Sequence, residues 1–195
     1  MQEEGKIGTN FDPLEDGKSQ LILVSVMGDD LSVVNDARVS YERNSDSFSE
    51  RDRKLLNYLV SPPDGHSHTS PLRGCVIKFE VKAPLFVARQ WYKHTVASTY
   101  VDEQLQWNEK SFRYTQIEET DYYLPVQFYL QSKSNKQKSD TVPIVMSEQY
   151  RLALGNHIDY GLALYRGMLE MGVAREQARG VLPAYCYTRF RWTSS

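Results

Sequence analysis

Apolar residues recur along the chain with the two spacings that distinguish strands from helices. The nearly unbroken apolar run LILVSVM, residues 21–27, has the length and β-branching of a buried strand. Apolar and polar residues alternate over residues 75–82 and again over 185–192, with Phe79 and Phe190 on the apolar side. This period of two predicts two further strands, each with one buried face.

Helical spacing of apolar residues predicts five helices, over residues 31–37, 49–60, 84–92, 147–171 and 174–179. Ser49 and Asp52 have the spacing of a capping box at the start of the second helix. Pro84 suits the first turn of the third helix, where its missing N–H has no cost. Gly172 is a stop signal for the longest helix.

The mixed order of these elements predicts a single α+β domain over residues 21–195. Residues 1–20 are rich in Gly, Asp and Asn, which indicates a flexible N-terminal arm. The segment QSKSNKQKSD, residues 131–140, has the composition of a solvated polar loop.

Composition excludes several classes of protein. The net charge of −2 over 195 residues lacks the basic excess of a nucleic-acid-binding protein. The only cysteines, Cys75 and Cys186, form no Cys-x-x-Cys pair, so neither a disulfide framework nor a zinc site is expected. No apolar run approaches the roughly 20 residues of a membrane span, and the acidic N-terminus is unlike a signal peptide. We expect a soluble, cytoplasmic protein.

Three polar clusters could carry chemistry. Arg89 and Lys93 lie four residues apart on one helix face, where they could hold a phosphate or form a solvated basic edge. The segment NEKSFRY, residues 108–114, combines phosphate donors with groups that suit the amide edge of a base, although a surface turn would have a similar composition. Arg175 and Arg179 share a helix face, where they could bind an anion or form salt bridges with Glu176 and other carboxylates.

Common catalytic signatures are absent from the sequence. It contains no phosphate-binding P-loop, no G-x-G-x-x-G, no G-x-S-x-G and no H-E-x-x-H. His66 and His68 would share a face of an extended segment, but no convincing third ligand accompanies them. No metal site is therefore expected.

Five ordered segments resemble the flavin-dependent thymidylate synthases. They are DLSVVNDARVSY at 30–41, HTSP at 68–71, VKAPLFVARQWYKH at 81–94, NEKSFRY at 108–114 and AREQARGVLPAYCYTRFRWT at 174–193. The resemblance implies a small antiparallel or mixed sheet packed against helices, in a homotetramer with active sites between subunits. It also implies methylation of dUMP at C5 to give dTMP, with carbon from methylenetetrahydrofolate and hydride from FAD that NADPH reduces.

The resemblance also assigns roles to individual residues. Ser111 and His68 are the candidates for a catalytic role. The positions that match the dUMP site are Gln90, Glu109, Ser111, Arg113 and Arg179. Those that match the FAD site are Ser40, Ser70, Lys93, His94 and Thr95, and those near the folate are His68 and Tyr114.

The chain departs from the family pattern at several points. In the family, an Arg-His-Arg motif is followed by seven residues and then by a Ser. Here the corresponding motif is Lys93-His94-Thr95, and fifteen residues separate Thr95 from Ser111. Arg73 stands where the family commonly has a Glu beside the flavin. The sequence stops at Ser195, where family members continue with Asn and Arg residues for flavin and nucleotide, so we expect either a further tail or a protein without those residues.

These departures leave two functional hypotheses. The first is an active flavin-dependent thymidylate synthase. The alternative is a nucleotide-binding relative with weak FAD binding and impaired or absent synthase activity. A nucleic-acid-binding module that uses residues 131–140 is the least favoured class because of the near-neutral charge.

Overall fold

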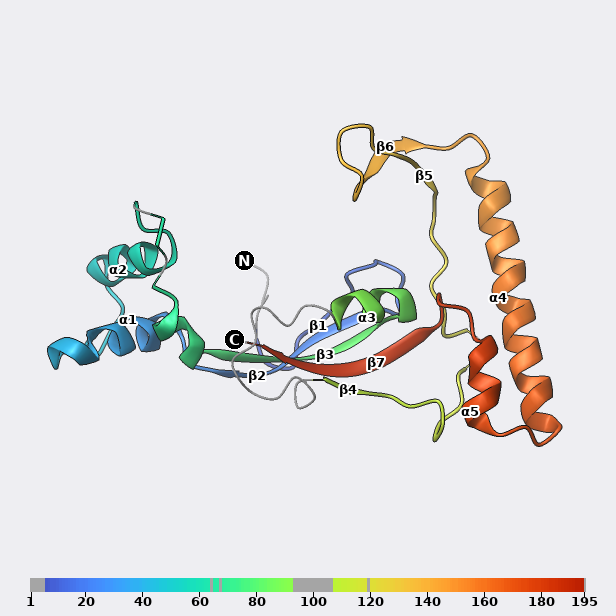
Figure 1. Ribbon diagram of the computed structural model, residues 1–195, viewed down its shortest axis with the longest axis horizontal. Coiled ribbons are helices and arrows are strands. Elements are labelled where there is room, and N and C mark those ends of the chain that lie inside the picture. The colour runs from blue at the N-terminus through green and yellow to red at the C-terminus, as the bar shows by residue number, and fades with distance from the viewer. Residues whose placement is uncertain (1–5, 64, 67, 93–106, 119, 195) are drawn as a thin grey trace.

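The protein is described by a computed structural model that covers residues 6–63, 65–66, 68–92, 107–118 and 120–194. Its centre is one antiparallel sheet of five strands in the order β1-β2-β3-β7-β4 (Figure 1). These strands are β1 (Asn10–Phe11), β2 (Gln20–Met27), β3 (Val76–Pro84), β7 (Tyr187–Ser194) and β4 (Trp107–Glu109). The predicted α+β class is confirmed, and the described sheet is antiparallel throughout.

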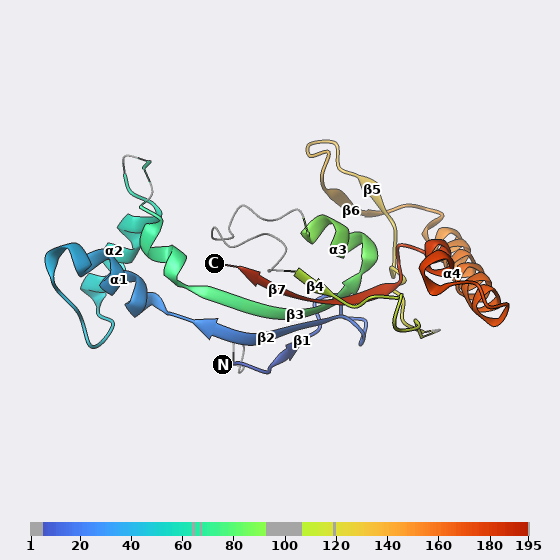
Figure 2. The ribbon, with the colours of Figure 1, turned by 60° about the horizontal axis from the view of Figure 1, so that its bottom comes forward.

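The strand alternation gives the sheet two different faces. One face carries an aromatic cluster in which the Trp107 ring stacks on Phe190 at 3.8 Å between centroids and Trp91 meets Phe190 edge-on at 5.6 Å. The helix α3 (Leu85–Trp91) lies over this face, as Figure 2 shows. The opposite face is charged, and Glu80 pairs there with both Arg189 and Arg191.

Helices extend the molecule beyond both ends of the sheet. At one end lie α1 (Asp30–Arg38), η1 (Val39–Tyr41), α2 (Glu50–Val60) and η2 (Ser70–Gly74). At the other end lie α4 (Ser147–Glu170), α5 (Arg175–Ala178) and η4 (Arg179–Val181) (Figures 1 and 2). The chain is therefore elongated.

Local sequence signals account for several helix ends. Ser49 and Asp52 form the predicted capping box of α2, because each side chain accepts a hydrogen bond from the other residue's backbone N–H. Gly172 adopts the left-handed conformation, with φ of 79°, just after α4. Pro84 differs by one position from the prediction, because it is the last residue of β3 and the cap of α3 rather than part of its first turn.

A second core joins α4 to α5 and to the segment after β4. Its buried members are Phe112, Ile117, Ile158, Leu162, Tyr165, Ala178 and Cys186. This core fixes the loop that follows β4 against the C-terminal helices.

Two polar segments contain more regular structure than their composition indicates. The region around 131–140 is exposed, as predicted, but its ends form a hairpin of β5 (Tyr129–Gln131) and β6 (Ser139–Pro143). Residues 6–19, within the predicted N-terminal arm, form β1 and a turn, and Asp16 accepts a hydrogen bond from Tyr187. Hydrophobic patterning does not predict the hairpin or the β1 segment, because the contacts that order them are made by the backbone and by polar side chains.

The run at 21–27 does form a strand, but it is less buried than predicted. Val26 and Met27 at its end are 45 % and 59 % exposed. Among the described residues, no helix is both long and apolar enough to cross a membrane.

Candidate functional site

The polar segment after β4 folds into a tight turn. The backbone N–H of Lys110 donates to the Arg189 carbonyl at 2.7 Å, and that of Tyr114 donates to the Ser111 carbonyl at 3.0 Å. The Phe112 side chain is buried in the core with α4 and α5. The turn thus presents polar side chains outward from an apolar anchor.

Arg113 is held at the surface of this turn by its neighbours. Its Nε donates to Ser111 Oγ at 3.4 Å, and its guanidinium carbon lies 5.4 Å from the centroid of the Tyr114 ring. Such a cation–π contact orients an exposed arginine while leaving its terminal N–H groups able to bind an anion.

The short helix α5 lies against the same turn. Ala178 shares the buried core with Phe112, and Arg175 Nη1 donates to the Tyr114 carbonyl at 3.0 Å. Arg179 follows Ala178 and donates from Nε to the Glu176 carbonyl at 3.3 Å. The structure therefore brings Ser111, Arg113 and Arg179 to one end of the molecule.

The salt-bridged alternative for this helix is not what the structure shows. Within the described ranges, neither Arg175 nor Arg179 forms an ion pair with a carboxylate. Both arginines donate to backbone carbonyls instead. Their positive charges are thus not neutralised by a carboxylate of the described chain.

Glu109 is held on the sheet next to this turn. Its Oε1 accepts from Thr188 Oγ1 at 2.7 Å and its Oε2 accepts from Trp107 Nε1 at 3.1 Å. The sequence showed Thr188 only as a strand residue. Because the Thr188 hydroxyl lies on an otherwise apolar strand face, the sequence could have indicated that this hydroxyl needs a polar partner such as Glu109.

The helix α3, which carries Gln90, contacts the same strand. Gln90 is exposed, and the next residue, Trp91, contacts Phe190. Phe190 is also the register partner of Glu109 across the β4–β7 pair. The sheet thus brings α3 and β4 to the same residue of β7.

The hydroxyls predicted to face a flavin lie at the other end of the sheet. Ser40 is in η1 and Ser70 begins η2, and both are exposed. The helix α1 contacts both α2 and η2, so these hydroxyls belong to one helical unit.

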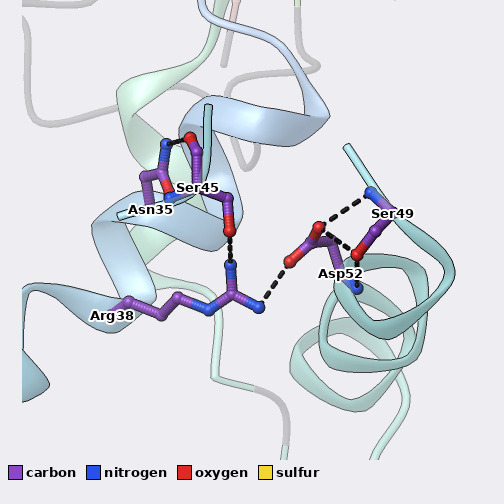
Figure 3. A network of polar contacts seen from close by, with 5 residues as sticks. All are labelled: Asn35, Arg38, Ser45, Ser49 and Asp52. Carbon is purple, nitrogen blue, oxygen red and sulfur yellow. Dashed lines mark hydrogen bonds and ion pairs between the residues drawn. The ribbon is translucent and has the colours of Figure 1, made fainter. Parts of the chain in front are cut away.

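A polar network holds this unit together, as Figure 3 shows. Asn35 makes two hydrogen bonds to the backbone of Ser45, accepting from its N–H at 2.8 Å and donating to its carbonyl at 3.0 Å. The Arg38 guanidinium donates to Ser45 Oγ and forms an ion pair with the buried Asp52. The network closes the loop that contains Ser40.

His68 also belongs to this end of the molecule. Its imidazole stacks on Tyr58 of α2 with 5.8 Å between centroids, and its backbone N–H donates to the Leu59 carbonyl at 2.9 Å. The nine residues of β3 separate this unit from the opposite end, a span of roughly 26 Å at about 3.3 Å per residue. One chain therefore does not bring His68 together with Ser111 or Tyr114.

Three predicted flavin residues, Lys93, His94 and Thr95, lie outside the described residues. Across the described part of the chain, no three His, Cys, Asp or Glu side chains have the arrangement of metal ligands.

Comparison with known proteins identifies the family. The family model described as "Thymidylate synthase complementing protein" matches residues 22–195. The chain is 40 % identical over 177 residues to a flavin-dependent thymidylate synthase of Thermosipho melanesiensis, covering 90 % of this chain and 71 % of that protein. This chain belongs to the family of flavin-dependent thymidylate synthases. The resemblance predicted from the ordered motifs is thereby confirmed.

Further relatives agree in sequence and in fold. A flavin-dependent thymidylate synthase of Thermus thermophilus is 44 % identical over 173 residues, which cover 87 % of this chain and 57 % of that protein. A crystal structure of the UMP/dUMP methylase PolB from Streptomyces cacaoi, bound with 5-Br dUMP, superposes with a TM-score of 0.73 at 26 % identity. That superposition covers 90 % of this chain and 73 % of the PolB chain.

Proposed function

We propose that this protein methylates dUMP at C5 to give dTMP, with its nucleotide site on the Ser111–Tyr114 turn and η4. The observation that carries the proposal is the junction of these two segments through Phe112, Ala178 and the Arg175–Tyr114 hydrogen bond. Family membership and the names of the relatives support the reaction class.

The residues at this junction have the donors that a nucleoside monophosphate needs. Arg113 and Arg179 are exposed cations whose planar N–H groups suit a phosphate. Ser111 offers a hydroxyl to the phosphate or the sugar. Glu109, already oriented by Thr188 and Trp107, retains lone pairs for the N–H of a uracil edge. We assign the exposed amide of Gln90 on α3 to the same nucleotide.

The helical unit around α1 and α2 fits the diphosphate of a flavin. Ser40 and Ser70 are exposed hydroxyls on elements that pack against one helix, as donors to a diphosphate should be. Reduced FAD would supply hydride, with NADPH as its reductant and methylenetetrahydrofolate as the carbon donor. His68 and Tyr114 are the aromatic side chains that we assign to the folate.

We propose that the active protein is a homotetramer whose sites lie between subunits. In one chain Ser40 and Ser70, which we assign to the flavin, lie beyond one end of the sheet, and Arg179, which we assign to the nucleotide, lies beyond the other. Large apolar side chains are also exposed along α4, among them Tyr150, Leu152, Tyr160 and Leu164. A second copy would cover such a surface and supply the missing half of each site.

The test of the nucleotide site is the Arg179→Ala variant. We expect it to bind dUMP more weakly by about 1.5–3 kcal/mol, the usual loss for a hydrogen bond to a charged group. Calorimetry measures the affinity, and release of tritium from C5-labelled dUMP measures the reaction.

The matched control is Arg151→Ala on α4, which removes a partly exposed arginine that pairs with Glu148. It should bind dUMP as the parent protein does. Unchanged dUMP affinity in the Arg179 variant would contradict the proposed site.

A further inference from the structure

The hydrogen bond from Arg175 to the Tyr114 carbonyl joins residues 61 positions apart. Both residues are exposed, and the side chain of Tyr114 is 73 % exposed. Phe112 before Tyr114 and Ile117 after it are buried, and the Tyr114 N–H donates to the Ser111 carbonyl within the turn. Arg175 adds a restraint on the Tyr114 carbonyl from a different element, α5.

The restrained carbonyl belongs to the residue whose ring lies beneath Arg113. Tyr114 contacts the Arg113 guanidinium through its ring, at 5.4 Å, and receives Arg175 at its carbonyl, at 3.0 Å. A shift of the Tyr114 backbone would move the ring and with it the cation that rests on it. The orientation of Arg113 therefore depends on Arg175 through Tyr114.

We propose that Arg175 is a positioning residue for nucleotide binding, which holds Tyr114 so that Arg113 faces the phosphate. The inference rests on the proposed function of the turn. Arg175 acts through the backbone of Tyr114 and does not itself touch the nucleotide. Because Arg175 restricts Arg113 before binding, Arg113 loses less conformational entropy when the phosphate binds.

The primary test compares Arg175→Met with Arg175→Lys. Methionine keeps an unbranched side chain but has no donor, so dUMP binding should weaken roughly threefold to tenfold, as expected for one hydrogen bond. Lysine can still donate to the Tyr114 carbonyl and should restore most of the affinity. The thermal midpoint of the Met variant should stay near that of Arg151→Met, which removes a surface arginine elsewhere on the molecule.

A double-mutant cycle with Arg113→Met separates positioning from direct contact. If Arg175 acts through Arg113, the Arg175→Met change has little further effect on dUMP affinity once Arg113 is replaced. Additive losses would show that Arg175 contacts the nucleotide independently and would overturn the proposal. An affinity for dUMP that Arg175→Met leaves unchanged would overturn it as well.

The Arg179→Ala variant, measured in parallel, distinguishes this inference from the proposed function. Weakened binding in Arg179→Ala with normal binding in Arg175→Met would refute the positioning role alone. Normal binding in both variants would refute the nucleotide site itself.

Discussion

Asp52 shows how one buried carboxylate can organise two helices. It completes the capping box of α2 and pairs with Arg38 at the end of α1 (Figure 3). The Ser49 hydroxyl is the main group that lowers the pKa of Asp52 below its ordinary value of 3.8, burial opposes this, and Arg38 lowers it further. The charged form is thus the one that the fold stabilises.

This shift predicts a specific loss of stability in acid. Because the folded pKa lies below the unfolded one, the ionised Asp52 contributes its full stabilisation above about pH 4 and loses it as the pH falls through the folded pKa. In Asp52→Asn this part of the pH dependence should be absent. Urea unfolding at pH 3 and pH 7 measures it, and an equal pH dependence in both proteins would contradict the assignment.

The two cysteines should differ in reactivity for a reason visible at the residue scale. Cys186 is fully buried, and burial together with Asp121 raises the pKa of its thiol to about 12. Burial and the carboxylates of Asp36, Asp29 and Asp30 also raise the pKa of the Cys75 thiol, so the contrast rests on access: Cys75 is only partly buried. We expect iodoacetamide at pH 8 to modify Cys75 in the native protein and Cys186 only after unfolding, as mass spectrometry of digests would report. Alkylation of native Cys186 would show that the core between β7 and α4 opens readily.

At the scale of elements, the close approach of α4 to the residues after α5 depends on a glycine. A β-carbon at Gly161 would lie 2.8 Å from Pro183 Cγ and 3.3 Å from the Val181 carbonyl oxygen. Val181 ends the element that begins with Arg179. The packing of one helix therefore sets the position of a residue that we assign to the nucleotide.

Alanine substitutions along α4 test this packing. Gly161→Ala should destabilise the protein by roughly 1–3 kcal/mol, because overpacking outweighs the helix propensity of alanine. Gly167→Ala is the matched control, since nothing lies within 4 Å of its added β-carbon. There alanine should stabilise the helix by about 0.5–1 kcal/mol. Thermal unfolding measures the stability of both variants. A Gly161→Ala protein that is more stable than the parent would contradict the close contact.

The elements predicted most accurately are those defined by local signals. The capping box of Ser49 and Asp52 and the stop at Gly172 act within four residues, so spacing alone reveals them. The hairpin of β5 and β6 was not predicted because its ordering contacts are polar. Gln131 Nε2 donates to three backbone carbonyls of its own loop. The spacing of hydrophobic residues does not predict such hydrogen bonds.

The site was predictable in its residue types but not in its connections. The sequence places Ser111, Arg113 and Arg179 in polar clusters, and the family motifs assign them to dUMP. The hydrogen bonds of Arg175 to Tyr114 and of Asn35 to Ser45 depend on tertiary packing, which residue spacing does not encode. The division of the site between two ends of the sheet is likewise a property of the folded chain.

At the scale of the whole molecule, this division predicts complementation between inactive variants. Arg179→Ala damages the nucleotide half of the site, and Ser40→Asp places a negative charge in the flavin half. If each site is built from two subunits, co-refolded mixtures contain some sites with two intact halves, about a quarter for random assembly of equal amounts. Tritium release from labelled dUMP should therefore reappear in the mixture.

The assembly itself can be measured directly. Light scattering should give a mass close to four times the 22.5 kDa of the chain. A mixture as inactive as its two components, or a monomeric mass at working concentration, would contradict a site shared between subunits.

The sheet order has a consequence for how the protein folds. β7 lies between β3 and β4 in the sheet, although it is the last of the three in the chain. β3 therefore pairs with a strand about a hundred residues further along the sequence. Pairings over such long separations slow folding, and until they form, β3 has an unpaired edge that invites aggregation. Trp107 and Trp192 pair across the β4–β7 contact. Their fluorescence should therefore change in the slow phase of refolding, after the far-ultraviolet signal of the helices has developed.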